Sequence, residues 1–497
     1  MSLLLTDVTV GDRPGRAVSV VDGRIAWLGD AREAPAADRV IAGEGALLTP
    51  AFVDGHVHAT ATGLALSGLD LHSSSSLREA VAATREHAGR TTGIVLGTGW
   101  DETGWPEGRG LTREDLDAVV GNRPAYLARV DVHSATVSTA LLDRVPSHLS
   151  GFSPDGRLRL DAHHAARSAA YGSVGPDQRR AAQRATLAAA AALGIGSVHE
   201  MAGPEVSGAE DLAGLLELAA TEPGPEVVGY WGELAERGGL NLVRELGLAG
   251  AGGDLFCDGA FGSHTAALSA PYTDRPETSG ALRFETASVV DHVRACTAAG
   301  IQAGFHVIGD AAVRQVLDAV DAVAAELGEG AVRACRHRLE HVELIDEGGI
   351  ERMRRLGMVA SVQSAFDAAW GGAHGMYAER LGPERAAATN PLADLSTAGV
   401  ALALGSDAPV TPLDPWGGVH AAVDHHTPGS GLRPFDAFDA ATHGGRYAAR
   451  AEHDAGPLAV GAPASLALWA AEVALSAVLA ERLRPACRLL LVNGEAL

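Results

Sequence analysis

Short apolar runs alternate with Ala-rich amphipathic stretches through the middle of the chain. The apolar runs lie at 49–58, 195–199, 226–231, 254–258, 301–306, 337–341, 358–363 and 401–407. Helical periodicity fills most of the gaps, as at 311–327 and 350–356. Alternation of strands and helices is typical of a parallel sheet, and eight such units predict a closed (β/α)8 barrel of the TIM type.

Both ends of the chain show a different pattern, in which short strand-like runs are separated by turn residues. These runs lie at 3–10, 17–21, 24–28, 464–469 and 489–493. We therefore expect residues 1–50 and 455–497 to form one small β-sandwich domain beside a barrel at 51–454. The stretch from about 60 to 190 is too long for one connection, so we expect it to hold an inserted subdomain.

The composition indicates a globular protein with a large core and an acidic surface. Hydrophobic residues make up 46% of the 497 residues, and the formal net charge is -23. Such a surface repels polyanions, which argues against a nucleic-acid partner. The chain shows neither an apolar run of membrane-spanning length nor the basic region of a signal peptide. Its four cysteines form no paired motif, so a cytoplasmic location is expected.

Metal-binding residue types stand at the ends of several apolar runs. The first run ends in His56 and His58, and alternation along a strand places both imidazoles on one face. The fifth run ends in His306, the sixth in His341 and the eighth in Asp407. Barrel enzymes collect functional groups at the C-terminal ends of their strands, so these five residues are expected to share one metal site. Imidazoles with a carboxylate suit zinc or a similar divalent ion.

Each of these residues also has a purely structural explanation. Histidines are often core or surface groups, and this chain has 20 of them, so some fall near strand ends by chance. Asp407 alone could cap the segment that follows it. The occurrence of such residues at four strand ends in order favours the metal site over these alternatives.

Longer motifs around these residues resemble a known family. They are LTPAFVDGHVHA at 48–59, GWDETGW at 99–105, DGAFGSHTAALSAPY at 258–272, GFHVIGDAAV at 304–313, RLEHVEL at 338–344 and ALGSDAPVTPLDPW at 403–416. Together they are similar to motifs of the amidohydrolase superfamily, in its branch of YtcJ-like hydrolases and N-substituted formamide deformylases. The resemblance extends to residue 469 and therefore covers most of the chain. It is specific for fold and metal chemistry and says little about the substrate.

Two positions depart from the pattern of that branch. Its members commonly carry a lysine in a K-x-F-x-DG motif, and in the superfamily a carbamylated lysine often bridges two metals. Here that position is Asp254, and the chain contains no lysine at all. Glu200, Asp254, Cys257 and Asp258 are the candidates for a bridge, although Asp258 is equally well explained as a turn residue. One metal and two metals both stay open. The second departure, Ser465 in place of an aspartate, concerns a turn of the small domain.

The resemblance implies a hydrolase in which Asp407 acts as general base and then as general acid beside the metal. His341 or His264 would stabilise the developing oxyanion, and Trp100 and His264 are candidate substrate contacts. Hydrolysis of a carbon–nitrogen bond in an amide, formamide or cyclic amide is the leading expectation.

A metal-dependent lyase, decarboxylase or isomerase on the same barrel is the alternative. A metal-free binding protein is disfavoured by the set of potential ligands. The expected substrate is a small molecule, and the sequence defines neither its identity nor whether the chain forms a homo-oligomer.

Overall fold

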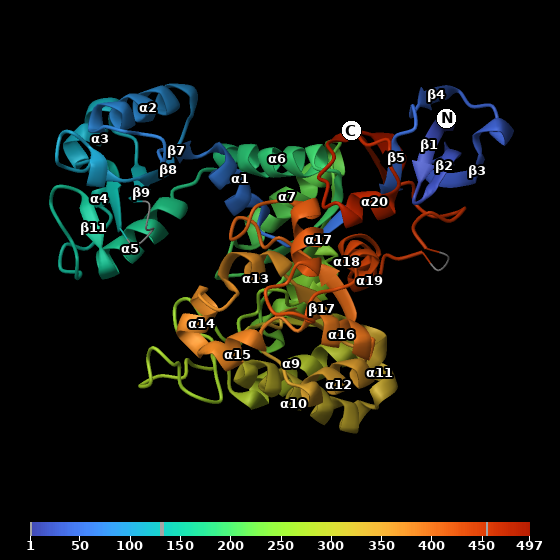
Figure 1. The fold of residues 1–497 in the computed structure, drawn as a ribbon. Helices are drawn as coiled ribbons and strands as arrows, with labels where there is room; N and C mark the ends of the chain where they lie inside the picture. Colours follow the sequence, from blue (N-terminus) through green and yellow to red (C-terminus); the bar gives the residue numbers. More distant parts are fainter. Residues whose placement is uncertain (1, 130–133, 454–455) are drawn as a thin grey trace. The chain divides into compact units, whose positions relative to one another are not determined.

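The chain folds into two compact units. The computed structural model describes residues 2–129, 134–453 and 456–497 (Figure 1). Unit 1 comprises Met1–His58 with Leu187–Leu497, and unit 2 comprises Ala59–Thr186. The predicted fold class is confirmed: unit 1 contains a parallel barrel together with a mixed sheet built from both termini.

The barrel is an eight-stranded parallel sheet within the described residues. Its strands are β6 (Phe52–Val57), β12 (Ile195–Ala202), β13 (Glu226–Trp231), β14 (Gly250–Ala251), β15 (Gln302–Val307), β16 (Arg338–His341), β17 (Val359–Val362) and β18 (Ala401–Leu404). Side chains on both faces of most of these strands are buried, which explains their nearly continuous apolar sequences. The Asp407 amide donates to the His56 carbonyl (2.8 Å) and the His58 amide to the Ala408 carbonyl (3.0 Å), so the first and last strands meet.

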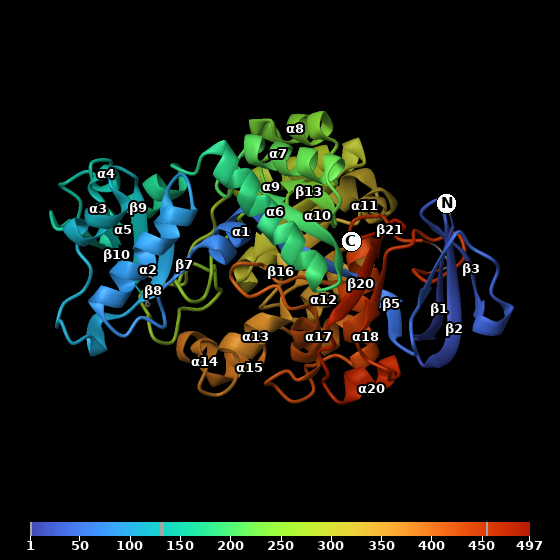
Figure 2. The same cartoon turned by 90° about the horizontal axis from the view of Figure 1, so that it is seen from above.

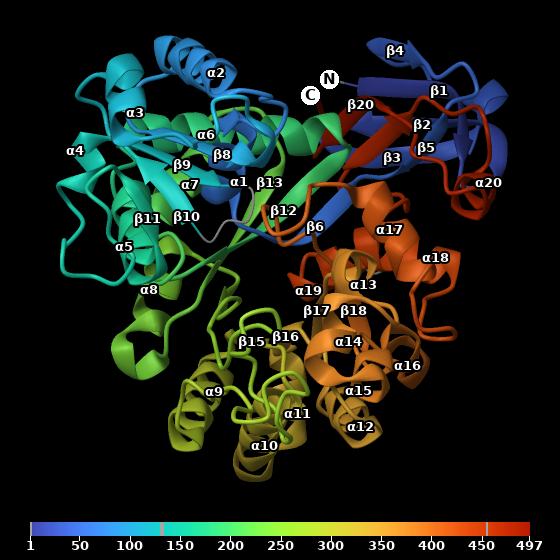
Figure 3. The same ribbon diagram turned by 60° about the vertical axis from the view of Figure 1, so that its left-hand side comes forward.

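Helices surround the barrel strands and follow the predicted alternation (Figure 3). They are α7 (Ala209–Thr221), α8 (Gly239–Leu246), α9 (Thr286–Ala299), α10 (Asp310–Leu327), α11 (Glu329–Cys335), α12 (Glu347–Leu356), α13 (Ser364–Trp370), α14 (Met376–Leu381), α15 (Pro383–Ala387), α16 (Leu392–Ala398), α17 (Pro415–Val423), α18 (Pro434–Asp439) and α19 (Gly445–Ala448). Local signals set their ends. Asp346 caps α12 by accepting from the Gly349 amide (2.7 Å), and Gly357 ends it in the left-handed conformation.

The fourth barrel strand differs from the sequence prediction. Residues 254–258 were expected to form it, but β14 comprises only Gly250–Ala251, and 254–258 lie in the connection that follows. Gly252 and Gly253 have φ values of +148° and +83°, which side-chain-bearing residues rarely adopt, so the strand stops before them. The prediction was wrong because Leu255 and Cys257 are apolar for another reason: both are buried in an irregular segment.

Strands from both ends of the chain form one mixed sheet, with β1, β2, β3 and β5 beside β20 in Figure 2. Its members are β1 (Ser2–Val10), β2 (Arg13–Val21), β3 (Arg24–Asp30), β4 (Arg39–Ala42), β5 (Leu47–Pro50), β19 (Leu466–Trp469), β20 (Cys487–Val492) and β21 (Glu495–Ala496); helix α20 (Leu475–Ala480) joins β19 to β20. Strand β5 links the two ends because it pairs with both β1 and β19. Ser465 lies here, where its hydroxyl accepts from the Asn493 amide (3.2 Å).

Trp469→Ala is expected to lower the free energy of unfolding of unit 1 by about 3–5 kcal/mol, because it empties a large buried site. Trp469 is 1% exposed, and its indole donates to the Thr49 hydroxyl (2.8 Å). Its ring also packs against those of Phe52 and Trp416, at 5.5 and 5.1 Å between centroids. Urea unfolding checks this, with the half-buried Trp27→Ala as control. Equal losses in the two variants would contradict it.

Unit 2 has its own five-stranded sheet in the order β11-β10-β9-β8-β7. Its elements are α1 (Ala59–Ser67), β7 (Leu69–Asp70), α2 (Leu77–Arg90), β8 (Val95–Trp100), α3 (Arg113–Val120), β9 (Ala125–Arg129), β10 (Ser134–Val137), α4 (Thr139–Leu142), β11 (Arg157–Arg159) and α5 (Leu160–Tyr171); α6 (Pro176–Ala192) leads back to unit 1. Alternation along β9 serves two cores: Ala125 and Leu127 pack with α2 and α3, whereas Tyr126 and Ala128 pack with α5. In the described parts of both units, every helix is too short or too polar to cross a bilayer.

Candidate metal centre

The structure brings together the five residues that the sequence places at strand ends, and Asp254 lies among them. Three overlapping groups offer ligand atoms within 4.8 Å of one another: His56 with His58 and Asp254, His56 with His341 and Asp407, and Asp254 with His306 and His341. We call these six residues the His/Asp cluster. They come from β6, β15 and β16 and from the segments that directly follow β6, β14 and β18.

Asp254 occupies the middle of the His/Asp cluster. Its Oδ1 lies 3.4 Å from His306 Nδ1, 3.6 Å from His56 Nε2 and 3.8 Å from His341 Nε2. Its Oδ2 lies 3.2 Å from His58 Nε2. Asp407 approaches two of these imidazoles, with Oδ1 at 3.1 Å from His58 Nε2 and 3.5 Å from His56 Nε2.

The cluster has the properties of a cation site. Buried atoms without a hydrogen-bond partner among the described residues include His56 Nε2, Asp254 Oδ1, His306 Nδ1, His341 Nε2 and Asp407 Oδ1. Each unpaired buried polar atom costs roughly 1–3 kcal/mol, so five directed at one space call for a common partner. Nitrogen and oxygen donors of this kind fit a divalent ion such as zinc.

Hydrogen bonds orient three of the imidazoles with one nitrogen free. His56 Nδ1 donates to Glu340 Oε2 (3.0 Å), and His341 Nδ1 donates to Gln363 Oε1 (2.7 Å). His306 Nε2 donates to a main-chain carbonyl, that of Gly259 (3.3 Å). In the neutral form of each ring, which is the form that binds a metal, the donating nitrogen carries the single proton and the other ring nitrogen presents a lone pair to the cluster. The three side chains are therefore preorganised as metal ligands.

Charge inside the cluster also favours a cation. Burial alone would raise the pKa of Asp254, but the imidazoles of His56, His306 and His341 hold it well below its usual range. Burial lowers the pKa of His56, yet the neighbouring Asp254 and Asp407 outweigh this and raise it to about 10. Both carboxylates are therefore negatively charged at neutral pH and attract positive charge into a buried space.

Two members of the cluster have unusual backbone conformations. His341 has φ +71° and Asp407 has φ +53°, in a region that costs residues with side chains roughly 1–3 kcal/mol each. Main-chain hydrogen bonds to neighbouring strands hold these conformations. The amide of Val342, next to His341, donates to the Val307 carbonyl (3.0 Å), and the Asp407 amide donates to the His56 carbonyl (2.8 Å). The surrounding barrel thus maintains strain that points both side chains at the cluster.

Glu340 and Arg338 support His56, and sequence reasoning missed both. Arg338 and Glu340 are fully buried in β16. Arg338 donates Nε to Glu340 Oε1 (2.5 Å) and Nη2 to the Gly55 carbonyl (2.9 Å), which fixes the carboxylate that His56 binds. The available signal was a pair of opposite charges, Arg338 and Glu340, two positions apart in a short predicted strand. Residues at this spacing lie on the same face of a strand. Gln363, which follows β17, supports His341 in the same way and was also missed.

Glu340→Gln is expected to weaken metal binding by about 10- to 100-fold, because supporting carboxylates orient metal-bound histidines and raise their basicity. A competition assay against a chelator measures the metal affinity of the Glu340→Gln protein, and circular dichroism checks that the variant is folded. The matched control is Glu347→Gln, since Glu347 is exposed in the first turn of α12. Unchanged affinity in folded Glu340→Gln protein would contradict this role.

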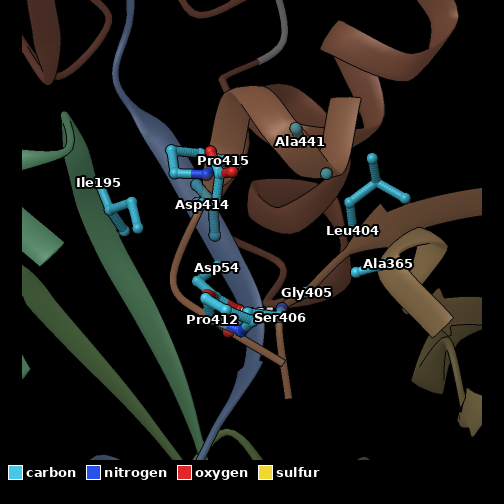
Figure 4. A pocket seen from close by; sticks show the side chains of 12 residues that line it. Asp54, Ile195, Ala365, Leu404, Gly405, Ser406, Pro412, Asp414, Pro415 and Ala441 are labelled. Carbon is cyan, nitrogen blue, oxygen red and sulfur yellow. Dashed lines mark hydrogen bonds between the residues drawn. The ribbon is translucent and has the colours of Figure 1, made fainter. Parts of the chain in front are cut away.

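Asp54 connects the first strand of the barrel to the segment that follows the last strand. Its Oδ1 accepts from the amides of His56 (3.2 Å) and Ser406 (2.9 Å), so β6 and the segment before Asp407 share one anchor. Asp54 and Ser406 also line a cavity of about 40 Å³, drawn in Figure 4. That volume suits one or two water molecules, and no residue of the His/Asp cluster lines it. This small cavity is therefore a packing feature beside the strand ends and not a substrate site.

Asp258 is an anchor of the segment beside His306, and it is not an ordinary exposed turn residue. Its side chain is 0% exposed and accepts from the amides of Ala267, Ile308 and Gly309, at 2.8–3.0 Å. Its carboxylate lies 4.0 Å from His306 Nε2, farther than Asp254 lies from the imidazoles. The other bridge candidate of this segment, Cys257, is fully buried, and burial raises the pKa of its thiol.

The remaining candidates lie outside the three ligand groups of the described residues. Glu200 is buried within β12, which continues to Ala202. Trp100 is 4% exposed in a core of unit 2, and its indole donates to a main-chain carbonyl of β9 (2.9 Å). His264 Nε2 lies 2.9 Å from Asp274 Oδ2 in the connection after β14. A substrate contact by Trp100 or His264 stays a prediction.

Comparison with known proteins is consistent with this geometry. Residues 39–497 match the model of the amidohydrolase family. The chain is 28% identical to YtcJ of Bacillus subtilis over 407 residues, which cover 76% of this chain and 73% of that protein. It is 26% identical to the N-substituted formamide deformylase of Arthrobacter pascens over 461 residues, or 86% and 83% of the two chains. The crystal structure of a metal-dependent hydrolase from Pyrococcus furiosus aligns with a TM-score of 0.79 at 27% identity, covering 94% of this chain and 98% of that one.

Proposed function

This chain belongs to the amidohydrolase family, and from that premise we propose that it hydrolyses a carbon–nitrogen bond in a small amide, formamide or cyclic amide. The observation that carries the proposal is the His/Asp cluster, whose buried ligand atoms lack partners among the described residues. A divalent ion bound there would polarise the substrate carbonyl and lower the pKa of a water from 15.7 to about 7. We propose zinc as that ion, because the donors are imidazoles and carboxylates.

We assign proton transfer to Asp407. Burial alone would raise the pKa of Asp407, but the neighbouring His56 and His58 lower it, so the side chain is ionised and can accept a proton. Its Oδ1 faces the imidazoles of His56 and His58 and has no hydrogen-bond donor among the described residues. Asp407 would take the proton of the attacking water and deliver it to the leaving nitrogen, as general base and then general acid.

We assign His341 to metal binding and not to oxyanion stabilisation. Burial and the nearby His306 lower the pKa of His341, so its imidazole is neutral at pH 7. Its single ring proton lies on Nδ1, which donates to Gln363, and Nε2 has only a lone pair to offer. A developing oxyanion needs a donor, which this nitrogen cannot provide.

A panel of N-formyl and N-acyl amines, with cyclic amides included, tests the proposed reaction. We expect release of free amine from at least one class by zinc-loaded protein, and no release by metal-free protein. A protein that binds metal and releases amine from no member of the panel would count against carbon–nitrogen hydrolysis. Equal release with and without metal would contradict the proposed role of the His/Asp cluster.

A further inference from the structure

We propose that Asp254 bridges two divalent ions, so that this lysine-free chain builds a two-metal site from side chains alone, without carbamylation. The inference deepens the proposed function by defining the metal arrangement of that same site. It concerns metal number and coordination, and it is tested without any substrate.

Asp254 is shared between separate pairs of histidines. It belongs to one ligand group with His56 and His58 and to another with His306 and His341. Its two oxygens face different sides of the cluster: Oδ2 is 3.2 Å from His58, whereas Oδ1 is 3.4 Å from His306, 3.8 Å from His341 and 3.6 Å from His56 between them. A carboxylate that offers one oxygen to each of two sites is arranged as a bridge, and metal pairs in such enzymes lie about 3.5–4 Å apart.

The number of donors in the cluster exceeds what one zinc ion uses. The cluster provides four imidazoles and two carboxylates. A catalytic zinc usually takes about three protein ligands and a water. Two ions that share Asp254 employ all six side chains: His56 and His58 hold one ion, His306 and His341 hold the other, and Asp407 completes the first.

Glycines allow the short side chain of Asp254 to reach the cluster. The main chain at 252–254 passes directly against its neighbours on both sides. A Cβ at Gly252 would lie 2.2 Å from the main chain of Gly304, and one at Gly304 would lie 2.6 Å from the Gly253 nitrogen. On the side of β13, a Cβ at Gly232 would lie 2.6 Å from the Asp254 carbonyl oxygen. Side chains at these positions would push the segment away, and a carboxylate only two bonds from its Cα could not compensate.

Manganese loading of the full chain measures the metal arrangement directly. Metal-free protein is titrated with Mn2+ in carbon-dioxide-depleted buffer and, in parallel, with added bicarbonate. We expect two Mn2+ per chain under both conditions and an electron paramagnetic resonance spectrum of an exchange-coupled pair. One Mn2+ per chain at saturation would overturn the proposal, as would a second ion that binds only with bicarbonate.

Variants of the same segment identify the bridge. Asp254→Asn is expected to reduce binding from two Mn2+ to one and to abolish the coupled spectrum. Gly304→Ala is expected to weaken the second ion by at least about tenfold through displacement of Asp254. Asp274→Asn, a partly exposed aspartate of the same connection, should keep two coupled ions. Two coupled ions in Asp254→Asn would overturn the proposal.

The wild-type measurement decides the matter even where a variant does not fold. Its outcome is also independent of the amine-release panel: inactivity toward every amide leaves the metal count unchanged, and a single bound ion leaves the hydrolysis result unchanged.

Discussion

Asp407→Asn is expected to lower kcat by about 10²–10⁴-fold, the range for losing a general acid–base group. Asparagine keeps the shape of the side chain and one oxygen, but it cannot accept the proton of the attacking water. The fold should survive, because the main-chain bond from Asp407 to His56 does not involve the side chain. Steady-state kinetics on the substrate found in the amine-release panel measure the effect, with metal content determined on the same sample.

The control for Asp407 is the aspartate that caps a helix in the same segment. Asp414 is the N-cap of α17 and accepts from the Gly417 amide (2.9 Å). Asp414→Ala should lower stability by about 0.5–2 kcal/mol and leave turnover near the wild-type value. If Asp407→Asn instead behaves like Asp414→Ala, with a lower melting temperature and normal turnover, the assignment of proton transfer to Asp407 is wrong.

Removal of the metal is expected to abolish turnover and to destabilise the fold. Without a cation, the buried ligand atoms of the His/Asp cluster lose the partner that offsets their desolvation. A ligand present at 1,000 times its Kd contributes about 4 kcal/mol to the folded state, so metal-free protein should melt at a lower temperature. Differential scanning calorimetry and activity assays before and after chelation measure both effects.

Readdition of zinc to the chelated protein should restore both quantities. The matched comparison is chelation of the Asp254→Asn variant. Its melting temperature should fall less on chelation than that of the wild-type protein, because the variant binds less metal at the start. Full turnover and an unchanged melting temperature in metal-free wild-type protein would contradict a metal-dependent function.

The barrel could be predicted from sequence because its strands are buried on both faces. Such strands appear as apolar runs, and seven of the eight predicted runs coincide with barrel strands or overlap them. The fourth did not, because β14 has only two residues and its apolar neighbours Leu255 and Cys257 are buried without forming a strand. Burial, and not strand structure, is what an apolar run reports.

The ligands of the cluster could be predicted because strand ends of a barrel converge, which is a property of the fold. Asp254 was a candidate from its motif alone, and its central place required coordinates. Glu340 was missed because it acts through His56, which is 284 positions away in sequence, and no local pattern reports such a pairing. Trp100, a candidate substrate contact, is packed in a core of unit 2.

Solvent-oxygen incorporation tests the central claim most directly. The zinc-loaded protein turns over its best substrate from the panel in water labelled with oxygen-18, and the acid product is analysed by mass spectrometry. Hydrolysis predicts one solvent oxygen in each acid product, formed in step with the amine and only in the presence of metal. Metal-dependent release of amine that leaves the other product free of the label would contradict hydrolysis and would indicate elimination of the amine by a lyase instead.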